Sequence, residues 1–190
     1  MRVCLIVGVL FVFGGIACAQ TQSNGRNQQQ TIFDENNPIA HPLSVPADVV
    51  KILLQRKEVK DSLNSARGVT QADAVRLFRA TEVYLGRPNE TDLLIAGTLP
   101  VTGADNDWYW VVRSTPNPKV LLWVGCLSIE LLKRATNGYC DINSSWSSAN
   151  HGWDDIYRFD GSMYTLWKRT TEDYMIPGSH KTHTSYPALH

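Results

Sequence analysis

Two tryptophans enclose the polar segment of this chain that is best equipped to bind a ligand. Trp146 and Trp153 flank a run of serine, alanine, asparagine, histidine and glycine that includes Asn150 and His151. An aromatic face beside hydroxyl, amide and imidazole groups can stack on a sugar ring or hold a peptide. Alternatively, one tryptophan closes the edge of the core beside a solvated loop. We take Trp146, Asn150, His151 and Trp153 as the candidate ligand-binding residues.

One set of residues has the types needed for covalent catalysis. Cys140, His151 and Asp154 could act as nucleophile, base and orienting acid if hydrogen bonds linked them. Cys140 is also expected in a strand, where a buried or disulfide-bonded thiol is the simpler interpretation. The sequence carries no motif of serine hydrolases, phosphate-binding loops or zinc peptidases. We therefore expect no catalytic residue, no metal site and no cofactor.

Cys126 and Cys140 present a choice between a disulfide and a tight hairpin. Paired cysteines in exported proteins are commonly bonded. A two-residue turn at Asn137-Gly138 would instead place Cys140 opposite Ala135. Cys126 would then lie about nine residues further along its strand, at about 3.3 Å per residue, whereas a disulfide needs Cα atoms within about 7 Å. The hairpin and the Cys126–Cys140 disulfide exclude each other, and the sequence leaves both open.

The first 19 residues predict export. Arg2 precedes an apolar run from Val3 to Ala17, and a small-residue cleavage site ends at Ala19. Cleavage before Gln20 is the interpretation we favour, and lipidation of Cys18 is the alternative. Both place the protein in the periplasm or outside the cell. No membrane span is expected after processing, because the run is shorter than the roughly 20 residues that a bilayer requires.

Charge and composition limit the partners and the domain count. The chain has 18 basic and 18 acidic side chains, and removal of Arg2 leaves the acids one in excess. No basic patch stands out, so nucleic acid is not an expected partner. Roughly 170 residues suffice for one domain with its own core. We expect a disordered or irregular leader over 20–43, a single domain over 44–168 and a loose C-terminal tail over 169–190.

Apolar spacing predicts an α+β fold. Helical periodicity follows Ser44, and helices are expected near 46–54, 59–63 and 70–81. Strands are expected at Asp92–Gly97, Asp107–Arg113, Lys119–Val124, Ser128–Leu132 and Tyr139–Trp146. A two-residue turn at Asp160-Gly161 closes a last hairpin and pairs Tyr157 with Tyr164. The expected architecture has two or three N-terminal helices packed on a twisted antiparallel sheet of about six strands, with Trp110 and Trp123 in the core.

Three short motifs occur in order along the second half of the chain. They are Asn-Gly-Tyr-x-Asp at 137–141, a serine-rich strand around Trp146, and Phe-Asp-Gly-x-x-Tyr at 159–164. Over residues 83–168 the chain resembles small secreted bacterial proteins of uncharacterised function that share this order. The resemblance implies an envelope location and provides no catalytic residue.

Together these features predict a non-enzymatic exported envelope protein. The expected partner is a cell-wall glycan or an envelope protein, bound through the region between Trp146 and Trp153. A cell-wall hydrolase using Cys140 and His151, or an inhibitor of a secreted enzyme, are the alternatives.

Overall fold

The computed structural model describes residues 29–66, 71–86, 90–103, 106–115, 117–175 and 180–186. The expected leader peptide, Cys18 and Gln20 lie outside these residues. Two short helices, α1 (Ala47–Leu54) and α2 (Lys57–Ser65), precede a 3₁₀ segment, Gln71–Leu77. The rest of the described chain is dominated by β-strands.

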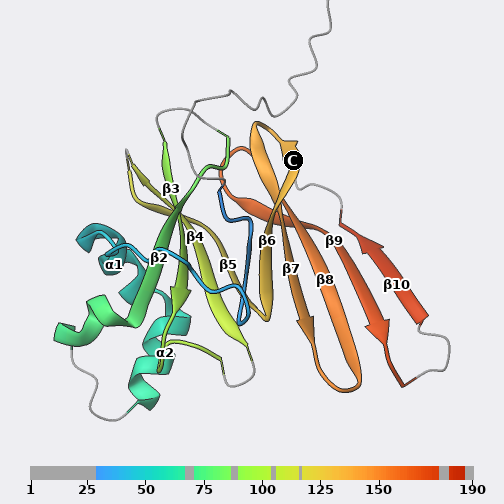
Figure 1. The fold of residues 1–190 in the computed structure, drawn as a ribbon, viewed down its shortest axis with the longest axis horizontal. Helices are drawn as coiled ribbons and strands as arrows, with labels where there is room; N and C mark the ends of the chain where they lie inside the picture. The colour runs from blue at the N-terminus through green and yellow to red at the C-terminus, as the bar shows by residue number, and fades with distance from the viewer. Residues whose placement is uncertain are drawn as a thin grey trace, which may run out of the picture.

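The strands form two antiparallel sheets (Figure 1). The four-stranded sheet consists of β2 (Phe78–Val83), β3 (Thr91–Gly97), β4 (Asp107–Thr115) and β5 (Lys119–Cys126), in that order. The six-stranded sheet consists of β1 (Ile32–Asp34), β6 (Ser128–Thr136), β7 (Tyr139–Ser147), β8 (His151–Phe159), β9 (Tyr164–Asp173) and β10 (His180–Ser185), also in that order.

The predicted α+β fold with a single sheet is wrong. The chain is mostly β, and two sheets replace the one of about six strands. The physical reason lies in β3, whose Leu93, Leu94 and Ile95 are all buried. A strand that is apolar on both faces belongs to a middle layer, with packing partners on each side. The expected helix over 70–81 is also wrong in its second half, because β2 begins at Phe78.

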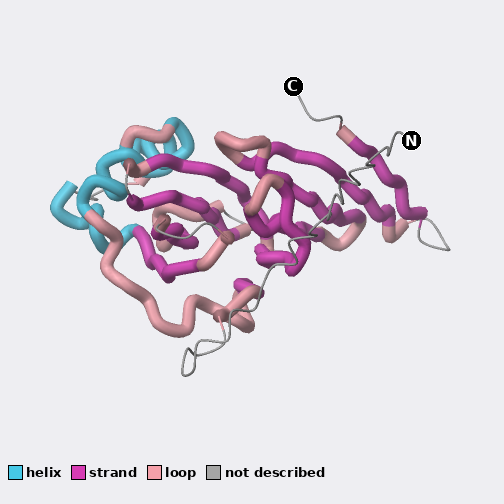
Figure 2. Tube along the Cα trace, turned by 90° about the horizontal axis from the view of Figure 1, so that it is seen from above, coloured by secondary structure: helices cyan, strands magenta, loops and turns pink. Residues whose placement is uncertain are grey.

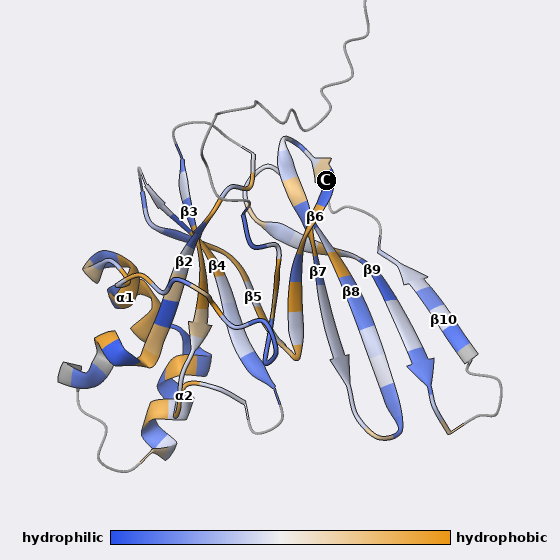
Figure 3. Ribbon diagram, in the orientation of Figure 1, coloured by the Kyte–Doolittle hydropathy of each residue, from blue (hydrophilic) through white to orange (hydrophobic). Residues whose placement is uncertain are grey.

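The four-stranded sheet is the middle of three layers. On one face it packs against the helices, in a core that includes Val49, Leu53, Phe78, Ile95 and Trp110. On the other face it packs against the larger sheet, in a core that includes Phe33, Leu94, Leu121, Ile142 and Phe159. Figure 2 shows the helices gathered at one end of the molecule and the strands of the larger sheet extending toward the other. Figure 3 shows that β8, β9 and β10 are mostly polar, as expected where the larger sheet extends past its partner.

The two predicted tight turns have different outcomes. The Asn137-Gly138 hairpin is confirmed, because both residues have positive φ, of 51° and 81°, and Ala135 pairs with Cys140. The Asp160-Gly161 register is wrong, since Phe159 pairs with Tyr164 around a four-residue loop. The carboxylate of Asp160 accepts hydrogen bonds from the backbone N–H groups of Ser162 and Met163, at 2.7 and 2.9 Å, which stabilises the longer loop.

Three further predictions concern the two cysteines, the two tryptophans expected in the core and the C-terminal residues. No disulfide joins the two described cysteines, Cys126 and Cys140, as the hairpin register requires. Trp110 is fully buried, whereas Trp123 is 39% exposed on the edge strand β5. The region expected to be a loose tail contains the end of β9 and the whole of β10, which pair with each other from Lys168 to Ser185.

Candidate functional site

The outer face of the larger sheet carries two rows of small polar residues. In one row Ser145 on β7 pairs with Asp154 on β8, which pairs with Thr170 on β9. The Ser145 hydroxyl donates a hydrogen bond of 2.5 Å to the Asp154 carboxylate. In the next row Gly152 lies between Ser147 and Glu172. Because strand side chains alternate between faces, these side chains all lie on the face away from the core.

A hollow of about 290 Å³ lies over these two rows. Its lining includes Ser145, Ser147, Asp154, Thr170, Glu172 and Tyr174. Gly152 permits the close approach of Tyr174, because a Cβ at this position would lie 2.7 Å from the Tyr174 hydroxyl oxygen and 2.9 Å from the Trp146 carbonyl oxygen. Hydroxyl groups and carboxylates therefore share this concave surface with apolar atoms, and a polar ligand can form several hydrogen bonds on it.

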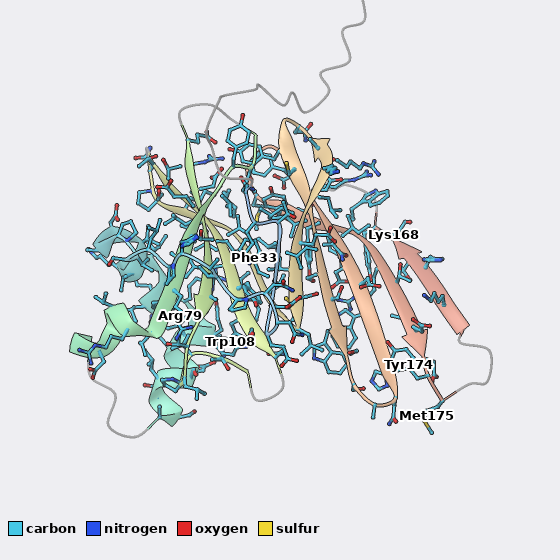
Figure 4. The ribbon with its side chains drawn as sticks, in the orientation of Figure 1. Phe33, Arg79, Trp108, Lys168, Tyr174 and Met175 are labelled. Atoms are coloured by element: carbon cyan, nitrogen blue, oxygen red, sulfur yellow. The ribbon has the colours of Figure 1, made fainter. Side chains whose placement is uncertain are left out.

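Tyr174 forms one wall of the hollow. It follows the last residue of β9, and its backbone N–H donates a 2.8 Å hydrogen bond to the carbonyl of Asn150 in the β7–β8 turn. The side chain of Tyr174 remains 47% exposed, and Figure 4 places it at the end of β9 beside that turn. The turn thus holds an aromatic ring at the hollow without burying it.

The structure brings together two of the four predicted ligand-binding residues, in an unexpected orientation. Trp146 and Trp153 are a cross-strand pair whose rings stack with centroids 4.1 Å apart and planes inclined by 19°. Both residues border the hollow. Strand alternation, however, directs their indoles to the face opposite the side chains of Ser145 and Asp154. The exposed ring beside the polar groups is that of Tyr174.

The other two predicted residues lie outside the lining of the hollow, Asn150 in the β7–β8 turn and His151 at the start of β8. Asn150 contributes its backbone carbonyl to Tyr174, as described above. His151 is exposed, and its ring centroid lies 6.1 Å from that of Trp146. The alternation of serine with tryptophan from Ser145 to Ser147 is the sequence signal that separates the side chains facing the hollow from those on the opposite face. Tyr174 was missed because residues 169–190 were expected to be loose.

A buried ion pair supports the sheet beneath the hollow. The Asp155 carboxylate, 2% exposed, accepts two hydrogen bonds of 2.6 Å from the guanidinium of Arg169 on β9. The Tyr157 hydroxyl also donates to this carboxylate, at 3.2 Å. Hydrogen bonds to Asp155 raise the pKa of Arg169, which therefore stays charged. The Arg169 guanidinium also lies over the Trp153 ring, with its carbon 5.5 Å from the centroid.

The residues of the catalytic alternative are not brought together. Cys140 lies next to the Asn137-Gly138 turn, near the beginning of β7, whereas His151 begins β8 at the far end of that hairpin. Ser147, the last residue of β7, lies roughly 23 Å along the strand from Cys140 at about 3.3 Å per residue, and His151 lies beyond the residue that pairs with it. Asp154 is hydrogen-bonded to Ser145. Burial raises the pKa of the other described cysteine, Cys126, to about 12, which disfavours its thiolate.

A second ionisable cluster lies between the sheets and was not anticipated from the sequence. The Tyr139 hydroxyl donates to Glu90 and accepts from Arg113, and Arg113 also pairs with Glu90 at 3.2 Å. Asp92, cross-strand from Arg113, is only 2% exposed. Burial raises the pKa of Asp92 to about 6, an effect that Arg113 opposes and Glu90 reinforces. Asp92 and Tyr139 are buried, while the side chains of Arg113 and Glu90 are 17% and 16% exposed, so the cluster bears on stability.

The raised pKa of Asp92 predicts that Asp92→Asn stabilises the protein at neutral pH. The folded state binds the Asp92 proton more tightly than the unfolded state, so this contribution to stability is complete below about pH 4 and is lost as the pH rises through about 6. We expect Asp92→Asn to increase the free energy of unfolding by about 2 kcal/mol at pH 7.5 and by little at pH 4. Urea denaturation of both proteins at the two pH values measures this difference, and a difference independent of pH would contradict it.

Comparison of the chain with known protein families, characterised proteins and solved structures gives no match. None of the described segments holds a helix with the length and apolar character that a bilayer crossing requires.

Proposed function

We propose that this protein is a non-enzymatic exported envelope protein that binds a cell-wall glycan in the hollow on the outer face of β7, β8 and β9. The observation that carries the proposal is the combination of hydroxyl groups, two carboxylates and the exposed Tyr174 ring around one concave surface. A sugar ring presents several hydroxyl groups that both donate and accept hydrogen bonds, and its apolar face packs against aromatic rings.

The rigidity of the site also favours binding. The side chains of the hollow lie on paired strands, and the ion pair between Asp155 and Arg169 fixes two of those strands from the opposite face. Such preorganisation lowers the entropy lost on binding. The export part of the proposal rests on the apolar leader that precedes Gln20. The predicted role of Trp146 and Trp153 becomes one of support, since their indoles stack on each other.

Binding to insoluble peptidoglycan tests the proposal. We expect the protein spanning residues 20–190 to sediment saturably with peptidoglycan, and heat-unfolded protein to remain in solution. Tyr174→Ala and Asp154→Ala should each weaken binding about tenfold, because each removes a ring or a charged acceptor that contacts the ligand. Their thermal midpoints should stay within a few degrees, since Tyr174 and Asp154 are both exposed.

Matched controls come from the opposite part of the molecule. Tyr84 is exposed at 57% and Glu82 is exposed on β2, both away from the hollow. Tyr84→Ala and Glu82→Ala should sediment like the unsubstituted protein. Equal sedimentation of all four variants would place binding elsewhere, and the absence of any sedimentation would contradict a glycan ligand and direct the search to an envelope protein.

A further inference from the structure

The charges of the hollow indicate more about its ligand than the hydroxyl groups do. Asp154 and Glu172 both line it, on adjacent strands and two residues apart in register, because Asp154 pairs with Thr170. Among the described residues of the lining there is no lysine, arginine or histidine. The charged groups of the lining are therefore both acidic, which favours cations over anions. Two basic side chains of β10 lie beside them, since Lys181 pairs with Glu172 and His183 Nδ1 is 3.0 Å from the Thr170 hydroxyl oxygen.

The existing partners of the two carboxylates leave much of their capacity for hydrogen bonds available. Asp154 accepts one hydrogen bond from Ser145, whereas a carboxylate offers about four acceptor sites. Glu172 is paired with Lys181 at 3.4 Å, and the Lys181 side chain is 56% exposed on β10. Such an exposed pair is weak and can be replaced by a better-placed donor.

On these grounds, and resting on the proposed function, we propose that the hollow selects glycans that carry a protonated primary amine. An ammonium group offers three donors, which can reach the carboxylates of Asp154 and Glu172 and the hydroxyl groups around them. The exposed face of Tyr174 adds a favourable surface for a cation. The corresponding N-acetylated sugar has one amide donor and no charge, and thus forms no ion pair with either carboxylate. The amine could belong to a 2-amino sugar or to a peptide attached to the glycan.

The test compares two tetrasaccharides that differ only at this group. Calorimetric titration at pH 6 and low salt, with the full mature chain, should show the tetramer of glucosamine binding about tenfold more tightly than the tetramer of N-acetylglucosamine. The preference should disappear in 0.5 M salt, because exposed charges are screened. A lysine-containing tripeptide serves as a third ligand and distinguishes the two sources of the amine. Tighter binding of this peptide than of the glucosamine tetramer assigns the amine to an attached peptide, and weaker binding assigns it to a 2-amino sugar.

Variants separate selectivity from binding itself. Asp154→Asn and Glu172→Gln should each reduce the preference for the amine severalfold. Lys181→Ala should tighten amine binding about twofold, because it removes the competing ammonium from Glu172. Asp160→Asn and Glu82→Gln remove the same charge from exposed sites elsewhere and should leave the preference unchanged.

The outcomes distinguish the two proposals. Equal affinity for both tetrasaccharides would overturn the amine selectivity and leave the glycan-binding function standing. A preference that persists in Asp154→Asn and Glu172→Gln would also overturn it, since the attraction would then come from overall charge. Binding of neither tetrasaccharide, together with no sedimentation on peptidoglycan, would overturn the function and the selectivity together.

Discussion

Gly86→Ala should lower the free energy of unfolding by more than about 3 kcal/mol, enough to unfold much of a marginally stable domain. Gly86 has a φ of 131°, a region that residues with a side chain rarely adopt. A Cβ there would overlap the carbonyl oxygen of Gly138, in the turn between β6 and β7. The neighbouring Leu85 carbonyl accepts a 2.8 Å hydrogen bond from Cys140, so the loop after β2 is held against this hairpin. Relief of the overlap therefore requires two backbone segments to separate.

Gly161→Ala is the matched control for this effect. Gly161 also has a positive φ, of 110°, but nothing lies within 4 Å of a Cβ placed there. Its substitution should cost only the conformational strain, about 1–2 kcal/mol. Urea denaturation followed by far-UV circular dichroism measures both variants. Equal losses for Gly86→Ala and Gly161→Ala would show that the contact with Gly138 contributes nothing.

Asp155→Ala should destabilise the protein by about 3 kcal/mol, the other large effect that the structure predicts. The substitution leaves the guanidinium of Arg169 without its bidentate acceptor and the Tyr157 hydroxyl without its partner. Because the Arg169 side chain is 38% exposed, water can solvate part of the unpaired charge, which keeps the loss near the lower end for a buried pair. The register of β8 against β9, on which the hollow depends, is expected to loosen as well.

Asp154→Ala is the control for this prediction, because Asp154 is the next residue along β8 and is exposed on the opposite face. Its loss should cost less than about 1 kcal/mol. Asp155→Asn should fall between the two, since the amide keeps one acceptor oxygen for Arg169. Chemical denaturation at pH 7.5 gives all three values. A cost for Asp155→Ala no larger than that for Asp154→Ala would contradict the role assigned to the buried pair.

Local turn chemistry was predictable where a single preference decides the geometry. Asn137-Gly138 forms its two-residue turn because both residues tolerate positive φ, and this register alone separates Cys126 from Cys140. Asp160-Gly161 is also a residue pair that favours a two-residue turn. The Asp160 side chain, however, accepts hydrogen bonds from two backbone N–H groups and stabilises a longer loop. Two acceptable turns compete there, and sequence preference alone does not rank them.

The layer architecture was not predictable by the same argument. Apolar residues on both faces of β3 and β4 satisfy two different cores, one with the helices and one with the larger sheet. The apolar pattern of a strand indicates that the strand is buried, but it does not indicate whether helices or a second sheet pack against it. β10 was missed because its residues, among them Lys181, Thr182 and His183, have no apolar face. Its position depends on backbone pairing with β9.

The predicted ligand-binding residues and the lining of the hollow overlap only in part. Trp146 and Trp153 do mark the strands that border the hollow, but their rings turn to the other face and stack on each other. The polar residues between them in sequence, Ser145 and Asp154, are the ones that line the hollow with Tyr174. Successive side chains of a strand point to opposite faces, so the residues that line the hollow are the sequence neighbours of the tryptophans and not the tryptophans themselves.

The most direct test of the account locates the ligand on the molecule. A ¹H–¹⁵N correlation spectrum of the mature protein, titrated with solubilised peptidoglycan fragments, reports every backbone amide that senses binding. We predict saturable shifts concentrated at Ser145, Gly152, Asp154, Glu172 and Tyr174, with the amides of α1 and α2 unchanged. Shifts confined to another surface, or no shifts at millimolar fragment concentration, would contradict a glycan site in the hollow.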